Sequence, residues 1–232
     1  MSAQAVSLPA RNGARLAKTL RNPLILFYYS GQIFRKLLEK LPFFRFIRES
    51  RDSETRITLG MWYTQKVRRI NYNAYWPMHP SSIVTYPHNV YAGINTSPGY
   101  NPGCNIHAVN KIYIGDYTQI ASNVGLMSGN HDLYDLRLQV EGEPIRIGKY
   151  CWIGMNTVIL PEVQLGDFTI VGAGAVVTKS FPEGHCVIAG NPAKKIRDLE
   201  KEKCIPYQDA HPYNGYIPHD KFEAYRKQYL NV

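Results

Sequence analysis

A strict six-residue repeat of branched apolar residues constrains this chain more than any other feature. Branched apolar residues stand six apart without a miss at Ile147, Ile153, Ile159, Leu165, Val171 and Val177. Glycine follows four of these six positions, and a small or branched residue comes four places after each of the first five. The same pattern occurs upstream at Ile114, Ile120 and Leu126.

A repeat this short is typical of a solenoid. An α-helix does not tolerate glycine at every sixth place, and an amphipathic strand has a period of two. A period of six fits a short strand plus a turn, three of which form one triangular coil. The branched residue would point inward, and the glycine would let the corner turn tightly. The strands of an ordinary barrel would give only a few such coincidences, so we predict a mainly β chain built as a parallel β-helix.

The repeat divides the chain. From Leu126 to Ile147 the spacing is 21 residues, which is not a multiple of six, so a loop leaves the coil there. We expect three segments: a basic, partly helical N-terminal arm (1–70), the β-helix with a loop excursion near 128–146 (71–200), and a short helical C-terminal tail (201–232).

The charge is concentrated in the arm. Of the net charge of +9, residues 1–70 carry +10, with 14 Lys and Arg against 4 Asp and Glu, and the remainder carries −1. This distribution argues against a basic body that wraps nucleic acid and favours an arm that meets something anionic. The composition, 44% hydrophobic with 18 Gly and 15 Pro in 232 residues, is that of a folded, turn-rich chain.

The arm has helical periodicity from about Arg15 to Ile47, interrupted at Pro23 and Pro42. Two interpretations remain: a helix packed on the body, or a basic amphipathic helix on a membrane face. Its longest uncharged run is shorter than the roughly 18 residues of a membrane span, and it fits a cleaved signal peptide poorly. The four cysteines form no CxxC pair. We therefore expect a cytoplasmic protein without a zinc site, which the second interpretation of the arm would hold at the inner face of the membrane.

The run from Ile145 to Glu200 resembles the hexapeptide-repeat acyltransferases, which include galactoside, maltose and polysaccharide O-acetyltransferases. The most specific pieces are WIG (Trp152–Gly154), VGAGAVVTK (Val171–Lys179) and AGNPAKKIR (Ala189–Arg197). The resemblance implies a left-handed β-helix, an exception to the usual right-handed crossover. It also implies a homotrimer with acetyl-CoA between neighbouring subunits and no metal.

The family's catalytic histidine lies on the loop that leaves the helix, a place matched by His131 in GNHD (Gly129–Asp132). A sugar hydroxyl is a poor nucleophile near neutral pH, and an imidazole suits the role of its general base. Asp132 or Asp135 could orient the imidazole, but neighbours on a strand end point to opposite sides, so a backbone carbonyl or another residue remains open. Asn95 resembles the family asparagine that holds the acceptor hydroxyl.

The resemblance also assigns contacts to coenzyme A. Trp152 matches a tryptophan near the cofactor cleft, although a packed corner aromatic is the alternative. Met155 and Ala173 match positions whose backbone groups bind the pantetheine arm, and Thr178 and Lys179 match phosphate-side contacts. Lys194 and Arg197 match basic positions near the 3′-phosphate, where Lys194 replaces a frequent arginine.

The leading hypothesis is a coenzyme A-dependent O-acetyltransferase that acts on a saccharide hydroxyl in surface polysaccharide or glycolipid synthesis. An alternative keeps the fold but transfers to an antibiotic or to an amino group of a nucleotide sugar. A zinc hydratase on the same solenoid needs three converging histidines, whereas His107 and His131 are isolated. A non-catalytic scaffold is the remaining alternative.

Overall fold

The computed structural model describes residues 32–34 and 36–232, which form two compact units, 1–45 and 46–232. In the described part of the first unit, residues 36–39 are helical and Pro42 begins the 3₁₀ helix η1 (Pro42–Phe44), which the short helix α3 (Arg45–Glu49) follows. The described part of the predicted arm is therefore only partly helical, since residues 50–58 form turns and extended chain. Most of the expected helix over 15–47 lies outside the described residues.

The second unit begins with a helical segment that precedes the strands. It comprises α4 (Leu59–Trp62) and the π-helix η2 (Tyr63–Val67). Thr58 caps α4 by accepting a hydrogen bond from the Met61 amide. The buried Gln65 side chain donates to the carbonyls of Ala74 and Trp76. It thereby ties this segment to the start of the β-helix.

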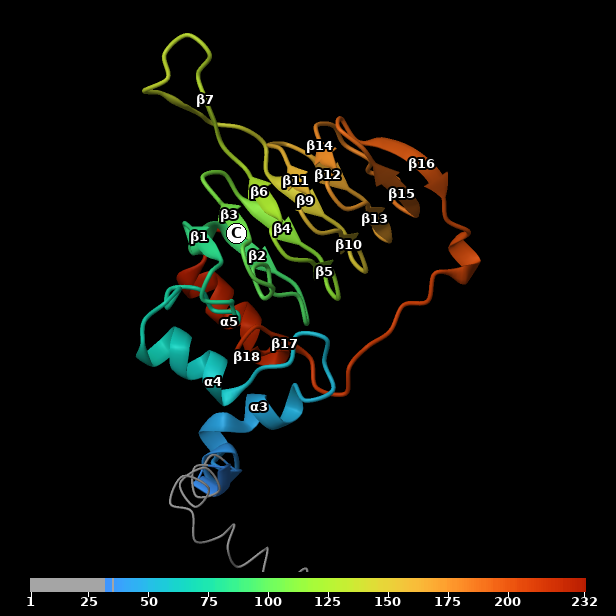
Figure 1. Ribbon diagram of the computed structural model, residues 1–232. Helices are drawn as coiled ribbons and strands as arrows, with labels where there is room; N and C mark the ends of the chain where they lie inside the picture. Colours follow the sequence, from blue (N-terminus) through green and yellow to red (C-terminus); the bar gives the residue numbers. More distant parts are fainter. Residues whose placement is uncertain (1–31, 35) are drawn as a thin grey trace, which may run out of the picture. The chain divides into compact units, whose positions relative to one another are not determined.

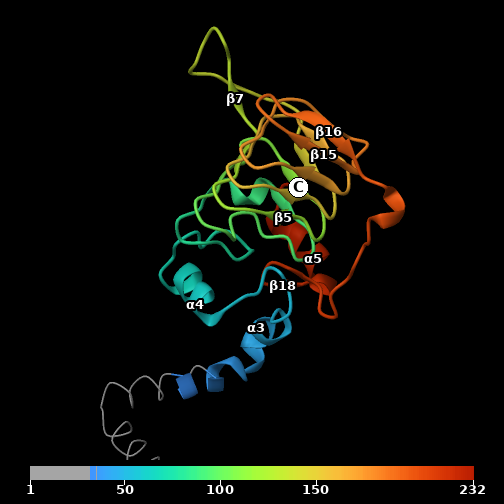
Figure 2. The ribbon, with the colours of Figure 1, turned by 45° about the vertical axis from the view of Figure 1, so that its right-hand side comes forward.

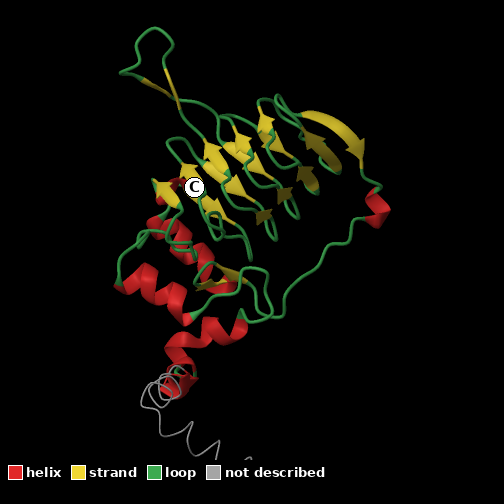
Figure 3. Cartoon of the chain, viewed as in Figure 1, coloured by secondary structure: helices red, strands yellow, loops and turns green. Residues whose placement is uncertain are grey.

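Three parallel sheets form the body of the second unit, and Figure 1 and Figure 3 show their strands in successive coils. Sheet A contains β1 (Ile83–Thr85), β3 (Asn105–His107), β6 (Gly125–Met127), β11 (Val158–Ile159) and β14 (Val176–Val177). Sheet B contains β2 (Val90–Ala92), β4 (Ile112–Ile114), β9 (Ile145–Ile147) and β12 (Gln164–Leu165). Sheet C contains β5 (Gln119–Ile120), β10 (Trp152–Ile153), β13 (Thr169–Val171) and β15 (Cys186–Ala189), followed by the antiparallel β16 (Lys194–Asp198).

The chain passes through the sheets in the order A, B, C, so each coil has three corners, which we call AB, BC and CA after the sheets that they join. Each predicted inward residue is the last of a strand, except Leu126, which is the middle residue of β6, and all are at most 5% exposed. Equivalent residues are in register in consecutive coils, as Leu126, Ile159 and Val177 are in sheet A. The predicted solenoid and its apolar interior are confirmed.

The glycine that follows the inward residue serves a purpose other than the expected one. Gly115 and Gly148 have no positive φ; the left-handed residue of the BC corner comes two places later, at Tyr117 and Tyr150. A Cβ on Gly115 would lie 2.6 Å from the Gly148 backbone, and one on Gly148 would lie 2.5 Å from the Asp167 amide nitrogen. Glycine is required because consecutive coils approach closely, and the turn itself is made by the left-handed residue.

The BC corner carries a column of aromatic rings. Tyr117 and Tyr150 stack with centroids 5.4 Å apart, Tyr150 and Phe168 follow at 4.9 Å, and His185 lies beyond Phe168 at 5.1 Å. All four residues have positive φ. The stacking therefore accompanies a backbone conformation that L-residues adopt rarely.

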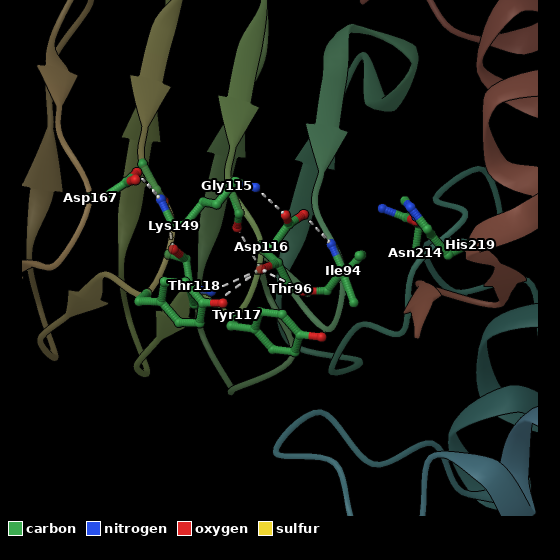
Figure 4. A network of polar contacts seen from close by, with 12 residues as sticks. Ile94, Thr96, Gly115, Asp116, Tyr117, Thr118, Lys149, Asp167, Asn214 and His219 are labelled. Carbon is green, nitrogen blue, oxygen red and sulfur yellow. Dashed lines mark hydrogen bonds and ion pairs between the residues drawn. The ribbon is translucent and has the colours of Figure 1, made fainter. Parts of the chain in front are cut away.

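Polar contacts join the same corners between coils (Figure 4). The Asp116 carboxylate accepts a hydrogen bond from the Ile94 amide at 2.9 Å and pairs with Lys149 Nζ at 2.8 Å. The Lys149 amide in turn donates to Asp167 Oδ1 at 2.7 Å. These contacts fix the vertical spacing of the BC corner.

The tail returns along the outside of the β-helix to its first coil (Figure 2). After η4 (Lys201–Lys203) it forms the antiparallel pair β17 (Tyr213–Asn214) and β18 (Ile217–Pro218), and then α5 (His219–Tyr229). Phe222 is 2% exposed and contacts Tyr75 and Tyr91, so α5 packs on the start of sheet B. The helical tail that the sequence predicts is present.

Candidate functional site

The predicted loop excursion occupies residues 128–144, between β6 and β9, and leaves the β-helix at the AB corner (Figure 1). Its stem is the antiparallel pair β7 (Asn130–His131) and β8 (Gln139–Val140), in which His131 lies opposite Gln139. The His131 side chain is exposed, and its ring makes no hydrogen bond to any described residue. It is therefore held on a stem strand but open to a second molecule.

The exit of the loop is rigidly built. Ser128 is fully buried, and its hydroxyl donates to the carbonyls of His107 and Asn110 at 3.0 and 2.6 Å. The Asn110 amide returns a bond to the Ser128 carbonyl at 2.8 Å. A Cβ on Gly129 would lie 2.8 Å from Cβ of Val109, so only glycine fits there. The residues that precede His131 fix the direction in which its strand leaves the coil.

The two acidic residues near His131 organise the loop tip instead. Asp132 Oδ1 accepts hydrogen bonds from the amides of Tyr134 and Asp135, both at 2.8 Å, which lower the pKa of its carboxyl. Asp135 pairs with Arg137 at 2.7 Å. Within the described residues neither carboxylate is bonded to the imidazole, so both are engaged in shaping the turn.

Asn95 lies at the BC corner, across sheet B from the corner at which the His131 loop leaves. Its side-chain amide donates to the Asp209 carboxylate, and its backbone amide donates to the Tyr213 carbonyl at 2.8 Å. It is 6% exposed. Burial raises the pKa of Asp209, and the bond from Asn95 opposes that shift. The structure does not bring Asn95 and His131 together within one chain.

Two of the residues predicted to contact coenzyme A lie on the outer face of sheet C. Trp152 is 58% exposed and is in register with Ile170, which is followed by Val187 and then by Arg197 on β16. Trp152 and Arg197 thus lie three strands apart in one row across the outer face of this sheet, and Gln119 of β5 continues the row beyond Trp152. Lys194, at the start of β16, is also exposed.

Met155 and Ala173 occupy the CA corner in consecutive coils. The Gly174 amide donates to the Met155 carbonyl at 2.8 Å, which holds the two turns together. The amides of Met155 and Ala173 make no hydrogen bond within the described part of the chain, and both residues are exposed. Two neighbouring N–H donors are therefore open to an acceptor from outside.

Thr178 and Lys179 directly follow β14 at the AB corner and are exposed. The Lys179 Nζ lies 5.9 Å from the centre of the Phe181 ring. The predicted contacts therefore fall on both edges of sheet A and on the face of sheet C. They do not converge on one enclosed pocket of a single chain.

Sequence reasoning missed the contribution of the tail to the AB corner. Residues of α5 and of the last three positions border two cavities beside the foot of the loop. The tail lies outside the repeat, and only the spacing of Tyr225 and Tyr229, one helical turn apart, hinted at a shared face.

Two further observations concern the described residues alone. They contain no helix long and apolar enough to cross a membrane. Nor do they hold a group of three or more His, Cys, Asp or Glu side chains that could bind a metal ion.

Comparison with known proteins places the chain in a family. The family of bacterial transferase hexapeptide (six repeats) matches residues 144–179. A galactoside acetyltransferase solved in complex with coenzyme A is 35% identical, with a TM-score of 0.50, over 59% of this chain and 68% of that one. This chain belongs to the hexapeptide-repeat acyltransferases, whose fold is the left-handed parallel β-helix.

Two curated relatives come from Escherichia coli strain K12. A putative colanic acid biosynthesis acetyltransferase, WcaF, is 34% identical over 52% of this chain and 65% of its own length. Galactoside O-acetyltransferase is 34% identical over 57% of this chain and 66% of its own length. The chain thus spans less than two thirds of each of these relatives.

Proposed function

We propose that the protein is an acetyl-CoA-dependent O-acetyltransferase that acts on a saccharide hydroxyl, with His131 as the general base. The observation that carries the proposal is the placement of His131 on a fixed stem strand with an unbonded ring. The relatives support it, since one is a galactoside O-acetyltransferase and another is named for colanic acid biosynthesis. We infer from them a role in surface polysaccharide or glycolipid synthesis.

In the proposed reaction the imidazole of His131 takes the proton of the acceptor hydroxyl while that oxygen attacks the thioester carbonyl carbon. A tetrahedral oxyanion forms, and backbone N–H donors stabilise it. Its collapse breaks the carbon–sulfur bond, and the imidazolium returns the proton to the sulfur. The products are the acetyl ester and free coenzyme A, with no covalent enzyme intermediate.

The donor's contacts follow from the exposed groups on sheet C and its edge. The open amides of Met155 and Ala173 suit the amide carbonyls of a pantetheine arm. Lys194 and Arg197 carry the positive charge that phosphates require, and Arg197 adds a bidentate fork. Trp152 offers an exposed ring beside them, and Thr178 and Lys179 complete the set from the other edge of sheet A.

The distribution of these groups favours a homotrimer with sites between subunits. The loop exposes a contiguous apolar set, with Leu133 at 87%, Tyr134 at 98% and Leu136 at 72%. Exposed apolar patches of this kind mark interaction surfaces. A loop that packs on a neighbouring subunit would carry His131 to that subunit's donor contacts, and Asn95 could join only across such an interface.

We assign catalysis to residues 71–200 and a positioning role to the arm (1–70) and the tail (201–232). In the arm, Ile33, Phe34 and Leu37 are more than half exposed, and Lys36 and Lys40 stand beside them. An apolar stripe flanked by lysines suits the anionic inner face of a membrane, where lipid-linked saccharides are assembled.

Acceptor profiling tests the proposal. The purified chain is incubated with acetyl-CoA and a panel of saccharides, amino sugars and antibiotics, and released thiol and acetylated product are measured. The proposal predicts thiol release that depends on a saccharide hydroxyl. Acetyl transfer only to amines or to antibiotics would contradict the proposal and favour the alternative acceptors.

A further inference from the structure

The AB corner has two cavities next to each other. The tail cavity, of about 300 Å³, lies between the first AB corner and α5, and Tyr86, His88, Tyr225 and Tyr229 are among its walls. The loop-foot cavity, of about 280 Å³, lies between the next coil and the base of the His131 loop. Asn110, Lys111 and Glu141 are among the residues that line it.

Two asparagines of the loop-foot cavity, Asn89 and Asn231, directly follow His88 and Leu230 of the tail cavity in sequence. Asn231 Nδ2 donates to Asn89 Oδ1 at 2.9 Å, and the Asn231 amide donates to the His88 carbonyl at 2.8 Å. Asn89 Nδ2 in turn donates to the Ala108 carbonyl at 2.9 Å. Because His88 and Leu230 line one cavity while Asn89 and Asn231 line the other, the two open on either side of this contact.

The tail cavity has the chemistry of a sugar subsite. Tyr86 and Tyr229 are 49% and 56% exposed, so each presents part of a ring to solvent. Tyr229 packs on Tyr225 with centroids 4.8 Å apart, and α5 is anchored by the buried Phe222, so the ring is held in place. Rigid aromatic faces with a few polar groups beside them suit a polar ring that has apolar C–H faces. The lining has no Asp, Glu, Lys or Arg side chain.

The loop-foot cavity lies at the base of the loop that carries His131. Asn110 Nδ2 donates to the Ser128 carbonyl at 2.8 Å, at the residue where the loop departs toward His131. Gly142 and Pro144, on the returning side of the loop, also line the cavity. Cavities that bind small molecules begin at about 300 Å³, so each of the two is sized for one sugar unit rather than for a long segment.

We propose that the two cavities form one extended groove for an oligosaccharide acceptor, with one uncharged sugar unit in the tail cavity and the saccharide running past Asn89 and Asn231 toward His131. The inference rests on the proposed function in that it names the acceptor's form. It assigns to the tail a specificity-determining role, because a monosaccharide at the loop would leave the tail cavity empty.

The test compares oligosaccharides with their own units. Maltotetraose and cellotetraose, with glucose as their monomer, are titrated by calorimetry and used as acceptors with the wild type, Tyr86→Ala and Tyr229→Ala. Tyr63→Ala, an equally exposed tyrosine outside both cavities, is the control. A tetraose should bind at least about fivefold more tightly than glucose, since one stacked ring contributes roughly 1 kcal/mol. Each groove variant should remove most of that gain and raise KM while leaving kcat unchanged.

Equal affinity for tetraoses and glucose, or an equal loss in Tyr63→Ala, would overturn the groove. The two proposals fail separately. Tyrosine-dependent binding of a tetraose without acetyl transfer would leave the groove standing and remove the proposed function. If acetyl transfer to a saccharide were the same in the wild type, Tyr86→Ala and Tyr229→Ala, the proposed function would stand and the groove would be ruled out.

Discussion

Gly148 packs so closely on Asp167 of the next coil that a Cβ added to Gly148 would lie 2.5 Å from the Asp167 amide nitrogen. The same Asp167 accepts a hydrogen bond from the amide of Lys149. The glycine column therefore sets how tightly the coils stack. Its loss should affect stability before it affects chemistry.

Gly148→Ala should destabilise the protein by roughly 1–3 kcal/mol, because the added methyl group overpacks backbone that cannot move away. Gly125→Ala is the matched control, since its Cβ would meet only side-chain atoms, the nearest at 3.5 Å. Urea unfolding at one protein concentration measures both. Equal midpoints for the two variants would show that coil spacing is not what the glycines provide.

The stability of the helical segment should depend on pH through Lys66. Burial lowers the pKa of Lys66 to about 8 from its ordinary value of 10.5. Below pH 8 Lys66 is protonated in both the folded and the unfolded chain. Between pH 8 and pH 10.5 it is protonated mainly in the unfolded chain. Stability relative to Lys66→Met should therefore rise as the pH goes from 8 to 10.5.

Melting temperatures of the wild type and Lys66→Met at about pH 7 and pH 10 test this difference. Lys201→Met, at an exposed position, provides the control for general alkaline effects. A wild-type minus variant difference that stays constant between the two pH values would contradict the assignment.

The apolar loop tip should be needed for assembly. Replacing Leu133, Tyr134 and Leu136 together by serine removes the side chains that are proposed to pack on a neighbour. The variant should sediment as a smaller species than the wild type at the same concentration and lose activity although His131 is intact. Ile205→Ser, which alters an apolar residue 78% exposed in the tail, should change neither. A triple variant that assembles normally would place the interface elsewhere.

The arm should bind anionic membranes. Deletion of residues 1–45, one of the two compact units, should abolish flotation with vesicles that contain phosphatidylserine. Lys36→Glu with Lys40→Glu should weaken flotation, since each lysine near such a surface contributes about 1 kcal/mol. Equal flotation of the full chain and the deletion would remove membrane contact from the account.

The period of six was sufficient to predict the solenoid, because inward residues such as Ile153 and Ile159 repeat in three dimensions as they do in sequence. The break in the period also predicted the loop. The close approach of Gly148 to Asp167 was not predicted, because the sequence of one coil does not show how near the next coil lies. The hydrogen-bond partners of Asp132 and Asp135 were not predicted, because they depend on the backbone turn that the loop makes. The helix of the tail was predicted, but its packing was not, because nothing in the repeat indicates that α5 returns to the first coil.

The central claim is that His131 is the general base, and the turnover of His131→Ala with acetyl-CoA and a saccharide acceptor tests it most directly. Turnover should fall by roughly 10²–10⁴-fold while calorimetry shows unchanged binding of acetyl-CoA. His211→Ala, at an exposed histidine of the tail, should keep full activity. Turnover of His131→Ala within a few-fold of the wild type would contradict the account.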